Sequence, residues 1–247
     1  MNFTTLYFDS LGSTNDEARD QAKVGAAEGL CIVAGQQTAG RGRNGRNWIS
    51  EKDAGLFFSI VLRPKFGMPR FPLITLAAGV AAYDTLASFG IEPDIKWVND
   101  ILVGDKKICG ILAEMTDTKN GPAVILGVGI NLRSYNFPPE IADIATSLEA
   151  ETLSRHEAND VLARFTDLFA KLYSGLANGG ETGILLDEWA KRSSYFSGKQ
   201  VRIKLADGEV EGVTDGLEPN GSLRIRTSTG ETAVITAGDV KSLRRAV

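Results

Sequence analysis

The sequence contains two cysteines, one histidine and no apolar run approaching the about 20 residues needed to cross a membrane. Cys31 and Cys109 stand in apolar segments, which is typical of buried free thiols in a reducing compartment and not of a disulfide framework or a zinc site. The first residues show no basic segment followed by an apolar one, so we expect no secretory signal. We therefore expect a cytoplasmic protein without a membrane partner.

Positive charge is not in excess either, because 27 lysines and arginines stand against 31 aspartates and glutamates, a formal net charge of −4. No global positive field draws such a chain towards nucleic acid or anionic lipid, and we expect no nucleic-acid partner. A basic site has to be local. Residues 35–50 contain one, since Arg41, Arg43 and Arg46 occur there without an acidic residue.

The composition is 43% hydrophobic and 23% charged, which is ordinary for a globular protein that buries a core. We expect a helix that begins at Ser13, with Asp16 completing a capping box, and that ends at Gly25. Apolar spacing predicts further helices and strands, and together they indicate an α+β fold, a mixed sheet with covering helices. The helices are expected at 72–90, 161–173 and 185–194, and the strands at 30–37, 55–64 and in three or more segments between 94 and 132.

From Gly198 the sequence changes to short alternating strands separated by turn pairs. About fifty residues of this kind predict a small SH3-like β-barrel. We therefore expect a catalytic domain at 1–195 and a C-terminal barrel domain at 196–247. The turn pairs are Asp207-Gly208, Asn220-Gly221 and Thr229-Gly230.

The segment TAGRGRNGRNW, residues 38–48, has three readings from its composition. It can be a solvated surface loop, a nucleic-acid segment of the arginine–glycine type, or a shaped loop that grips an anion. Guanidinium groups match phosphate and carboxylate oxygens, glycines let the backbone approach a ligand, and Trp48 offers a flat face to an adenine. Composition alone leaves the three readings open.

The spacing G-R-G-R-x-G-R-x-W at Gly40–Trp48 resembles the signature of biotin–protein ligases. Four further segments are similar to motifs of that family and occur in its order, so the resemblance covers essentially the whole chain. They are S-T-N at 13–15, K-W-V-N-D at 96–100, K-I-C-G-I-L at 107–112 and G-V-G-I-N at 127–131.

The sequence departs from the family pattern in two places. Val98 stands where the family usually has proline, which we expect to loosen the turn before Asn99 without removing a functional group. Only twelve residues precede Ser13, too few for the DNA-binding helix-turn-helix of some family members. We therefore expect the monofunctional type, without a repressor role.

The resemblance implies a two-step reaction. Biotin and ATP give biotinyl-5′-AMP and pyrophosphate, and a lysine of a biotin carboxyl carrier domain then takes the biotin and releases AMP. ATP with Mg²⁺ is the implied co-substrate, and no tightly bound prosthetic group is expected. A glycine-rich, arginine-bearing loop is suited to gather charge at this reaction and to order as a lid that excludes water.

Family positions assign the biotin-binding residues. Without the family, Ser13, Thr14 and Asn15 would only cap a helix. Gln37 would end a strand, and Lys107 would be an exposed hairpin lysine. Arg43 and Lys107 are the expected catalytic residues. The biotin-binding set is Ser13, Thr14, Asn15, Gln37, Arg41, Gly42, Arg43, Lys107 and Gly110.

Family positions also assign the nucleotide-binding residues. Asp100 either holds its turn or helps to position Mg²⁺, and Asn131 either contacts the nucleotide or ends a strand. The sequence assigns no metal ligands, and Trp97 is as well suited to the core as to a ligand. The ATP-binding set is Arg43, Arg46, Trp48, Lys96, Asn99, Asp100 and Asn131.

Rival functions differ in class. A lipoate or octanoate ligase or transferase shares the core fold, although the arginine–glycine run and the predicted barrel favour biotin. A nucleic-acid module would use the basic loop, and a non-catalytic biotin sensor would bind without adenylating. The sequence leaves open whether the protein is a monomer or a homodimer, which carboxylase supplies the carrier, and how the barrel contributes.

Overall fold

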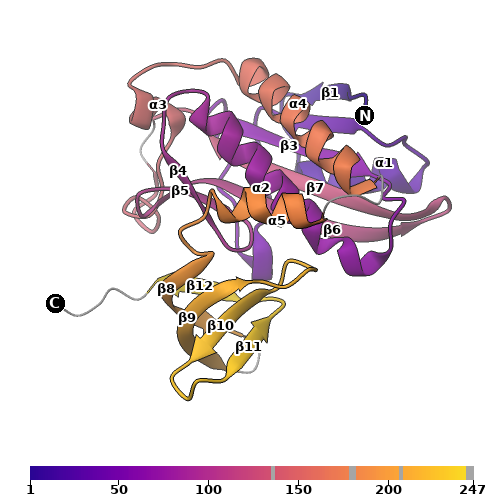
Figure 1. Cartoon of the computed structure of the whole chain (residues 1–247). Helices are drawn as coiled ribbons and strands as arrows, with labels where there is room; N and C mark the ends of the chain where they lie inside the picture. Colours follow the sequence, from indigo (N-terminus) through magenta and orange to yellow (C-terminus); the bar gives the residue numbers. More distant parts are fainter. Residues whose placement is uncertain (135–136, 178–181, 206–207, 243–247) are drawn as a thin grey trace.

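The computed structural model describes residues 1–134, 137–177, 182–205 and 208–242, which form two sheets and their covering helices (Figure 1). The helices are α1 (Thr14–Lys23), α2 (Pro72–Ala87), α3 (Leu148–Thr152), α4 (Ala158–Ala177) and α5 (Thr182–Ala190). The strands are β1 (Thr4–Phe8), β2 (Leu30–Ala34), β3 (Gly55–Leu62), β4 (Pro93–Lys96), β5 (Asp100–Val103), β6 (Lys106–Thr118), β7 (Gly121–Asn131), β8 (Ser197–Lys204), β9 (Glu209–Leu217), β10 (Leu223–Thr227), β11 (Thr232–Ile235) and β12 (Asp239–Ser242).

The first sheet has seven strands in the order β1-β2-β3-β7-β6-β5-β4. β1 and β2 are parallel and the other neighbouring pairs are antiparallel, so the predicted mixed sheet is confirmed. The sequence prediction missed β1, whose exposed and half-buried residues carry little apolar pattern. β3 is buried along nearly its whole length, which explains its almost uninterrupted apolar sequence.

Alternate side chains of the central strands point to two separate helical layers. Ile32 and Val61 face α1, where the small side chains of Ala18 and Ala22 let the helix approach the sheet closely. Cys31, next to Ile32, faces the opposite layer, which α2, α4 and α5 form (Figure 1). The N-terminal end of α1 is thereby held over β3, β6 and β7, where the candidate site lies.

The capping box predicted at the start of α1 is wrong, although the helix begins after Ser13 and Gly25 follows it with a positive φ of 105°. The Ser13 side chain makes no capping hydrogen bond. Asp16 instead accepts hydrogen bonds from Arg19 and Arg41. Hydrogen bonds between ionised partners are the stronger kind, so two arginines, one on the same helix and one on the loop, override the capping motif.

The second sheet contains five antiparallel strands in the order β11-β10-β9-β8-β12. Burial alternates along β8, where Val201 and Ile203 point inward. In the described part of the chain β11 and β12 remain the two edges, so the sheet does not close into the predicted barrel. The turns at 220–221 and 229–230 lie between strands as predicted, whereas Asp207 lies outside the described residues.

The two sheets meet at a tight turn of the second one. Trp97 Nε1 donates a hydrogen bond of 3.0 Å to the carbonyl oxygen of Gly221. A Cβ on Gly221 would lie 2.7 Å from Leu76 Cδ1, so only glycine lets this turn settle on α2. Trp97 is buried and therefore belongs to the core and to this contact.

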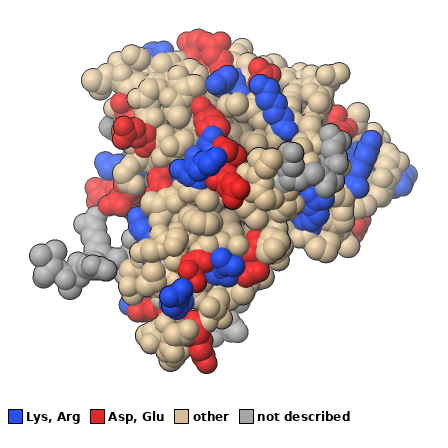
Figure 2. Space-filling view, in the orientation of Figure 1, with Lys and Arg blue, Asp and Glu red and all other residues tan. Residues whose placement is uncertain are grey.

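Within the described residues, no helix combines the length and the apolar character needed to cross a membrane. Figure 2 shows basic and acidic side chains interspersed over one face of the molecule, with no extended area of a single sign on that face. The basic residues of the arginine–glycine segment therefore have to be judged at the site itself.

Candidate functional site

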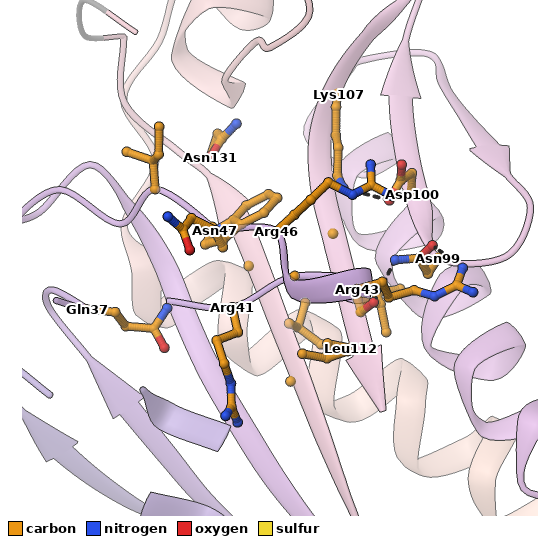
Figure 3. A pocket seen from close by; sticks show the side chains of 18 of the residues that line it. Gln37, Arg41, Arg43, Arg46, Asn47, Asn99, Asp100, Lys107, Leu112 and Asn131 are labelled. Carbon is orange, nitrogen blue, oxygen red and sulfur yellow. Dashed lines mark hydrogen bonds and ion pairs between the residues drawn. The ribbon is translucent and has the colours of Figure 1, made fainter. Parts of the chain in front are cut away.

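One cavity of about 250 Å³ gathers nearly all of the residues predicted from the sequence (Figure 3). It lies between the start of α1, the loop at 37–49, the first half of β6 and the second half of β7. Of the predicted residues, only Lys96 is not part of its lining. The predicted residues that line it are Ser13, Thr14, Asn15, Gln37, Arg41, Gly42, Arg43, Arg46, Trp48, Asn99, Asp100, Lys107, Gly110 and Asn131.

Uncharged polar groups form one end of the cavity. Gln37 Oε1 accepts hydrogen bonds from the Thr14 backbone N–H (2.8 Å) and hydroxyl (3.1 Å), and Gln37 Nε2 donates to Ser50 Oγ (2.9 Å). The buried Ser59 Oγ lies 2.7 Å from Thr14 Oγ1 and 2.6 Å from Asn15 Oδ1. Sequence reasoning missed Ser59, because a serine inside the apolar β3 carries no pattern of its own. These contacts fix each amide and hydroxyl in one orientation, as selective recognition of a neutral polar group requires.

Asn15 lies against β7 without any side chain between them. A Cβ on Gly127 would lie 2.1 Å from Asn15 Oδ1, so only glycine admits the amide here. The first glycine of the G-V-G-I-N motif therefore serves close packing of α1 on the sheet.

The arginine–glycine segment is a shaped loop. Trp48 N–H donates to Gly40 O (2.9 Å) and Gly42 N–H donates to Arg46 O (2.7 Å), so the segment folds back on itself. Asn44 at its tip has a left-handed φ of 57°. This geometry favours the reading as an anion-gripping loop; ordering on ligand binding stays a prediction.

Trp48 lies on the backbone of two glycines from neighbouring strands. A Cβ on Gly129 would lie 2.5 Å from the indole ring, and one on Gly110 would lie 2.8 Å from it. Lys107 Nζ lies 5.2 Å from the ring centroid, within the range of a cation–π contact. The glycines of both motifs therefore leave room for the flat indole ring of Trp48 beside the positive charge of Lys107.

Cationic groups gather at the other end of the cavity. Lys107 Nζ lies 2.6 Å from Asp100 Oδ1, and Arg43 Nη1 donates to Asn99 Oδ1 (3.2 Å). Burial lowers the pKa of Arg43, an effect that the charges of Asp239 and Asp100 oppose. The guanidinium stays charged at neutral pH. Burial also lowers the pKa of Lys96, which faces Asp100 across the β4–β5 hairpin.

Two further parts of the wall were not predicted. The segment at 137–145 contributes Phe137, Ile141 and Ile144, and it is held to β6 because Lys107 N–H donates to Ile144 O (2.7 Å). Asn131 Nδ2 donates to Thr146 O (2.9 Å), so this amide holds the chain directly after the same segment. The apolar residues of this loop have no helical or strand spacing that would have identified them.

The second sheet also reaches the cavity. Asp239, the first residue of β12, lines it and forms an ion pair with Arg46 of the loop. The two residues are 193 positions apart, and no local pattern predicts their contact. Within the described part of the chain, no group of three or more His, Cys, Asp or Glu residues is placed to hold a metal ion.

This geometry defines a site for an elongated ligand with a neutral polar head and an anionic end. The model of the Biotin/lipoate A/B protein ligase family matches residues 7–131, and that of the Biotin protein ligase C terminal domain matches residues 196–241. The chain belongs to the Biotin/lipoate A/B protein ligase family, which confirms the resemblance found in the sequence.

Individual relatives agree with this assignment. The Bifunctional ligase/repressor BirA of Bacillus subtilis (strain 168) is 36% identical over 236 residues, 94% of this chain and 72% of the relative. The Biotin–[acetyl-CoA-carboxylase] ligase of Mycobacterium tuberculosis is 32% identical over 240 residues, 94% of this chain and 86% of the relative. The biotin protein ligase of Aquifex aeolicus in complex with biotin and ATP is a similar solved structure, with a TM-score of 0.84 and 27% identity over 97% of this chain and 98% of that one.

Proposed function

We propose that this chain is a biotin–protein ligase, which activates biotin with ATP to biotinyl-5′-AMP and transfers the biotin to a lysine of a biotin carboxyl carrier domain. The observation that carries the proposal is the convergence of five separate sequence motifs on one cavity with a neutral end and a cationic end. The relative named Biotin–[acetyl-CoA-carboxylase] ligase and the solved structure with biotin and ATP support both substrates.

The neutral end suits the ureido ring of biotin. That ring carries one carbonyl acceptor and two N–H donors and no charge, and Ser13, Thr14, Asn15 and Gln37 offer hydroxyl and amide partners of both kinds. The cost of an unpaired buried polar group makes such a site selective. We assign this end to the biotin head and the adjacent Gly42 and Gly110 to its chain.

The cationic end suits the adenylation step. An oxygen of the biotin carboxylate forms a bond to the α-phosphorus, and the bond to pyrophosphate breaks. Two anions approach one another in this step, so Arg43 and Lys107 stabilise the charge that gathers between them. The nucleotide then lies against Trp48, with Arg46, Lys96, Asn99 and Asn131 around it.

Mg²⁺ that accompanies ATP neutralises phosphate charge. Asp100 and Asp239 are the carboxylates of the cavity lining, and a magnesium site built mainly from phosphates needs only one or two. In the second step the amine of the carrier lysine attacks the acyl carbon, an amide bond forms and AMP leaves.

We further propose that residues 1–195 carry the chemistry and that residues 196–247 contribute through Asp239 and the turn at Gly221. The buried free thiols of Cys31 and Cys109 support a cytoplasmic location.

The test is incubation of the protein with biotin, Mg-ATP and a purified biotin carboxyl carrier domain, followed by intact-mass analysis. The expected result is the gain of one biotinyl group on the carrier, and no gain would overturn the proposal. ATP–pyrophosphate exchange with biotin, lipoate or octanoate supplied separately identifies the acid that is activated. Exchange that requires lipoate or octanoate instead of biotin would assign the chain to the other branch of its family.

A further inference from the structure

Four charged side chains from three segments meet beside the neutral end of the cavity. We call them the charge quartet: Asp16 and Arg19 of α1, Arg41 of the loop and Glu114 of β6. Arg41 Nη2 lies 2.7 Å from Asp16 Oδ1 and 3.2 Å from Glu114 Oε2. Arg19 pairs with the same two carboxylates, at 2.5 Å and 2.9 Å. Two cations and two anions balance, so the charge of Arg41 is already neutralised by the chain.

The quartet is joined to the neutral end through Asn15. Glu114 Oε2 also accepts a hydrogen bond of 2.8 Å from Asn15 Nδ2. Since Ser59 contacts the other amide atom, Asn15 Oδ1, the two contacts together define which way the amide faces. Loss of Glu114 would leave this orientation to Ser59 and to the longer hydrogen bond of 3.4 Å that Asn15 Nδ2 donates to Leu112 O.

The quartet is also joined to the loop. The backbone of Arg41 forms an isolated antiparallel β-bridge with that of Asn47 across the loop. Fixing Arg41 therefore fixes the base of the loop tip at residues 42–46. Figure 3 shows the Arg41 side chain extending away from the cluster of Arg43, Asp100 and Lys107.

We propose, on the basis of the ligase function above, that Glu114 and Asp16 are positioning residues for the reaction. They hold Arg41 as the anchor of the loop, and Glu114 in addition orients the Asn15 amide towards the biotin head. Arg41 then acts through the position of the loop and not as a direct partner of the carboxylate or phosphate. A single exposed ion pair contributes little to stability. Several charges that form one network, with arginines shared between carboxylates, contribute more.

The anchor can be tested without any substrate by limited trypsin digestion and mass mapping of the cleavage sites. Trypsin must take the arginine side chain into its pocket, so a side chain held by two carboxylates is protected. In Asp16→Asn combined with Glu114→Gln, we expect cleavage after Arg41 to become about tenfold faster while cleavage after Arg46 stays unchanged. Glu17→Gln is the matched control, because Glu17 lies on the same turn but pairs with Gln21. Equal cleavage rates after Arg41 in all three proteins would overturn the anchor.

Kinetics test the orientation of Asn15. Glu114→Gln keeps a side-chain acceptor for the Asn15 amide, whereas Glu114→Leu leaves Asn15 Nδ2 only the carbonyl oxygen of Leu112 at 3.4 Å. In biotin-dependent pyrophosphate exchange we expect KM for biotin to rise about threefold in the first and about thirtyfold in the second, with kcat within twofold of wild type in both. Equal KM values in the two variants, or a loss confined to kcat, would refute the positioning role.

The two experiments also separate the proposal from the function on which it rests. An unchanged melting temperature in Glu114→Leu excludes general unfolding, and Glu114→Gln and Asp16→Asn carry the test if that variant does not fold. Absence of biotin-dependent exchange in the wild-type protein would contradict the ligase function, whereas the trypsin map would still decide whether the quartet anchors Arg41.

Discussion

Gly127→Ala places one methyl group where the structure has room for none. The added Cβ would lie 2.1 Å from Asn15 Oδ1 and 2.9 Å from Asn15 Cγ, so the amide has to move. Asn15 is buried, and its movement breaks the contacts to Ser59 and Glu114. Overpacking of this kind costs about 1–3 kcal/mol, and each buried polar group left without a partner costs about the same.

We therefore expect the variant to lose about 2–4 kcal/mol of unfolding free energy, a fall in melting temperature of about 4–16 °C. Because the displaced amide belongs to the proposed biotin head site, biotin affinity should fall about 30-fold or more, which corresponds to about 2 kcal/mol. Circular dichroism melting and calorimetric titration with biotin measure the two effects.

The chain offers a matched control and a rescue. Gly175→Ala in α4 adds a methyl group to open space and should stabilise the helix by about 0.5–1 kcal/mol. Asn15→Ala combined with Gly127→Ala relieves the clash, so it should recover most of the melting temperature but not the biotin affinity. A Gly127→Ala protein with wild-type stability and wild-type biotin affinity would show that the close approach of α1 and β7 has no role in the site.

Three further changes have expected outcomes. Lys107→Ala should slow biotin-dependent pyrophosphate exchange by at least 100-fold at an unchanged melting temperature, because it removes a charge at the reacting end; a near-normal rate would exclude Lys107 from catalysis. Asp239→Asn should lower the KM for ATP in pyrophosphate exchange several-fold, because Arg46 no longer has to leave Asp239 before it binds a phosphate, with less than about 1 kcal/mol lost on urea unfolding; an unchanged KM would show that this ion pair does not compete with ATP. Burial raises the pKa of the Cys31 thiol to about 12 and raises that of Cys109 as well. Both folded-state pKa values lie above the unfolded value of about 8.5, so this stabilisation is complete below pH 8.5 and is lost as pH rises towards 12. Urea unfolding should therefore show a loss of about 2 kcal/mol per thiol by pH 10, and a Cys31→Ala, Cys109→Ala variant should lose less over the same range.

The motif residues could be located from the sequence because their spacing is local. Residues Gly40–Trp48 form one loop, and the G-V-G-I-N segment forms the end of one strand. Residues that are neighbours in each motif are therefore also neighbours in the structure. The structure adds the reason why two of these positions are glycine. A Cβ on Gly127 would collide with Asn15, and one on Gly129 would collide with Trp48. That reason is invisible in the sequence, because it depends on what lies across the sheet.

The residues that were missed share a different property. Ser59, Glu114 and Asp239 each act on a partner at least 44 positions away in sequence. Periodicity states which face of an element a side chain occupies, but not which residue of another element it meets. The capping box failed in part for the same reason, since Asp16 pairs with Arg41 of the loop as well as with Arg19 of its own helix.

The two acidic residues of the cavity lining explain how an anionic ligand can enter a site whose cations are already paired. Lys107 carries three N–H donors on one ammonium group, so it can keep Asp100 and still donate to a ligand oxygen. Arg46 is mostly exposed and holds Asp239 from the tip region of the loop, so it has to exchange a partner on the other sheet for a ligand phosphate. We therefore expect the first cation to be in place before substrate arrives and the second to be recruited when the loop closes. Preorganised charge lowers the barrier of the reaction, whereas recruited charge couples closure to the presence of ATP. A loop that bears both an anchor at Arg41 and an exchangeable contact at Arg46 can therefore remain attached at one end while the other end moves.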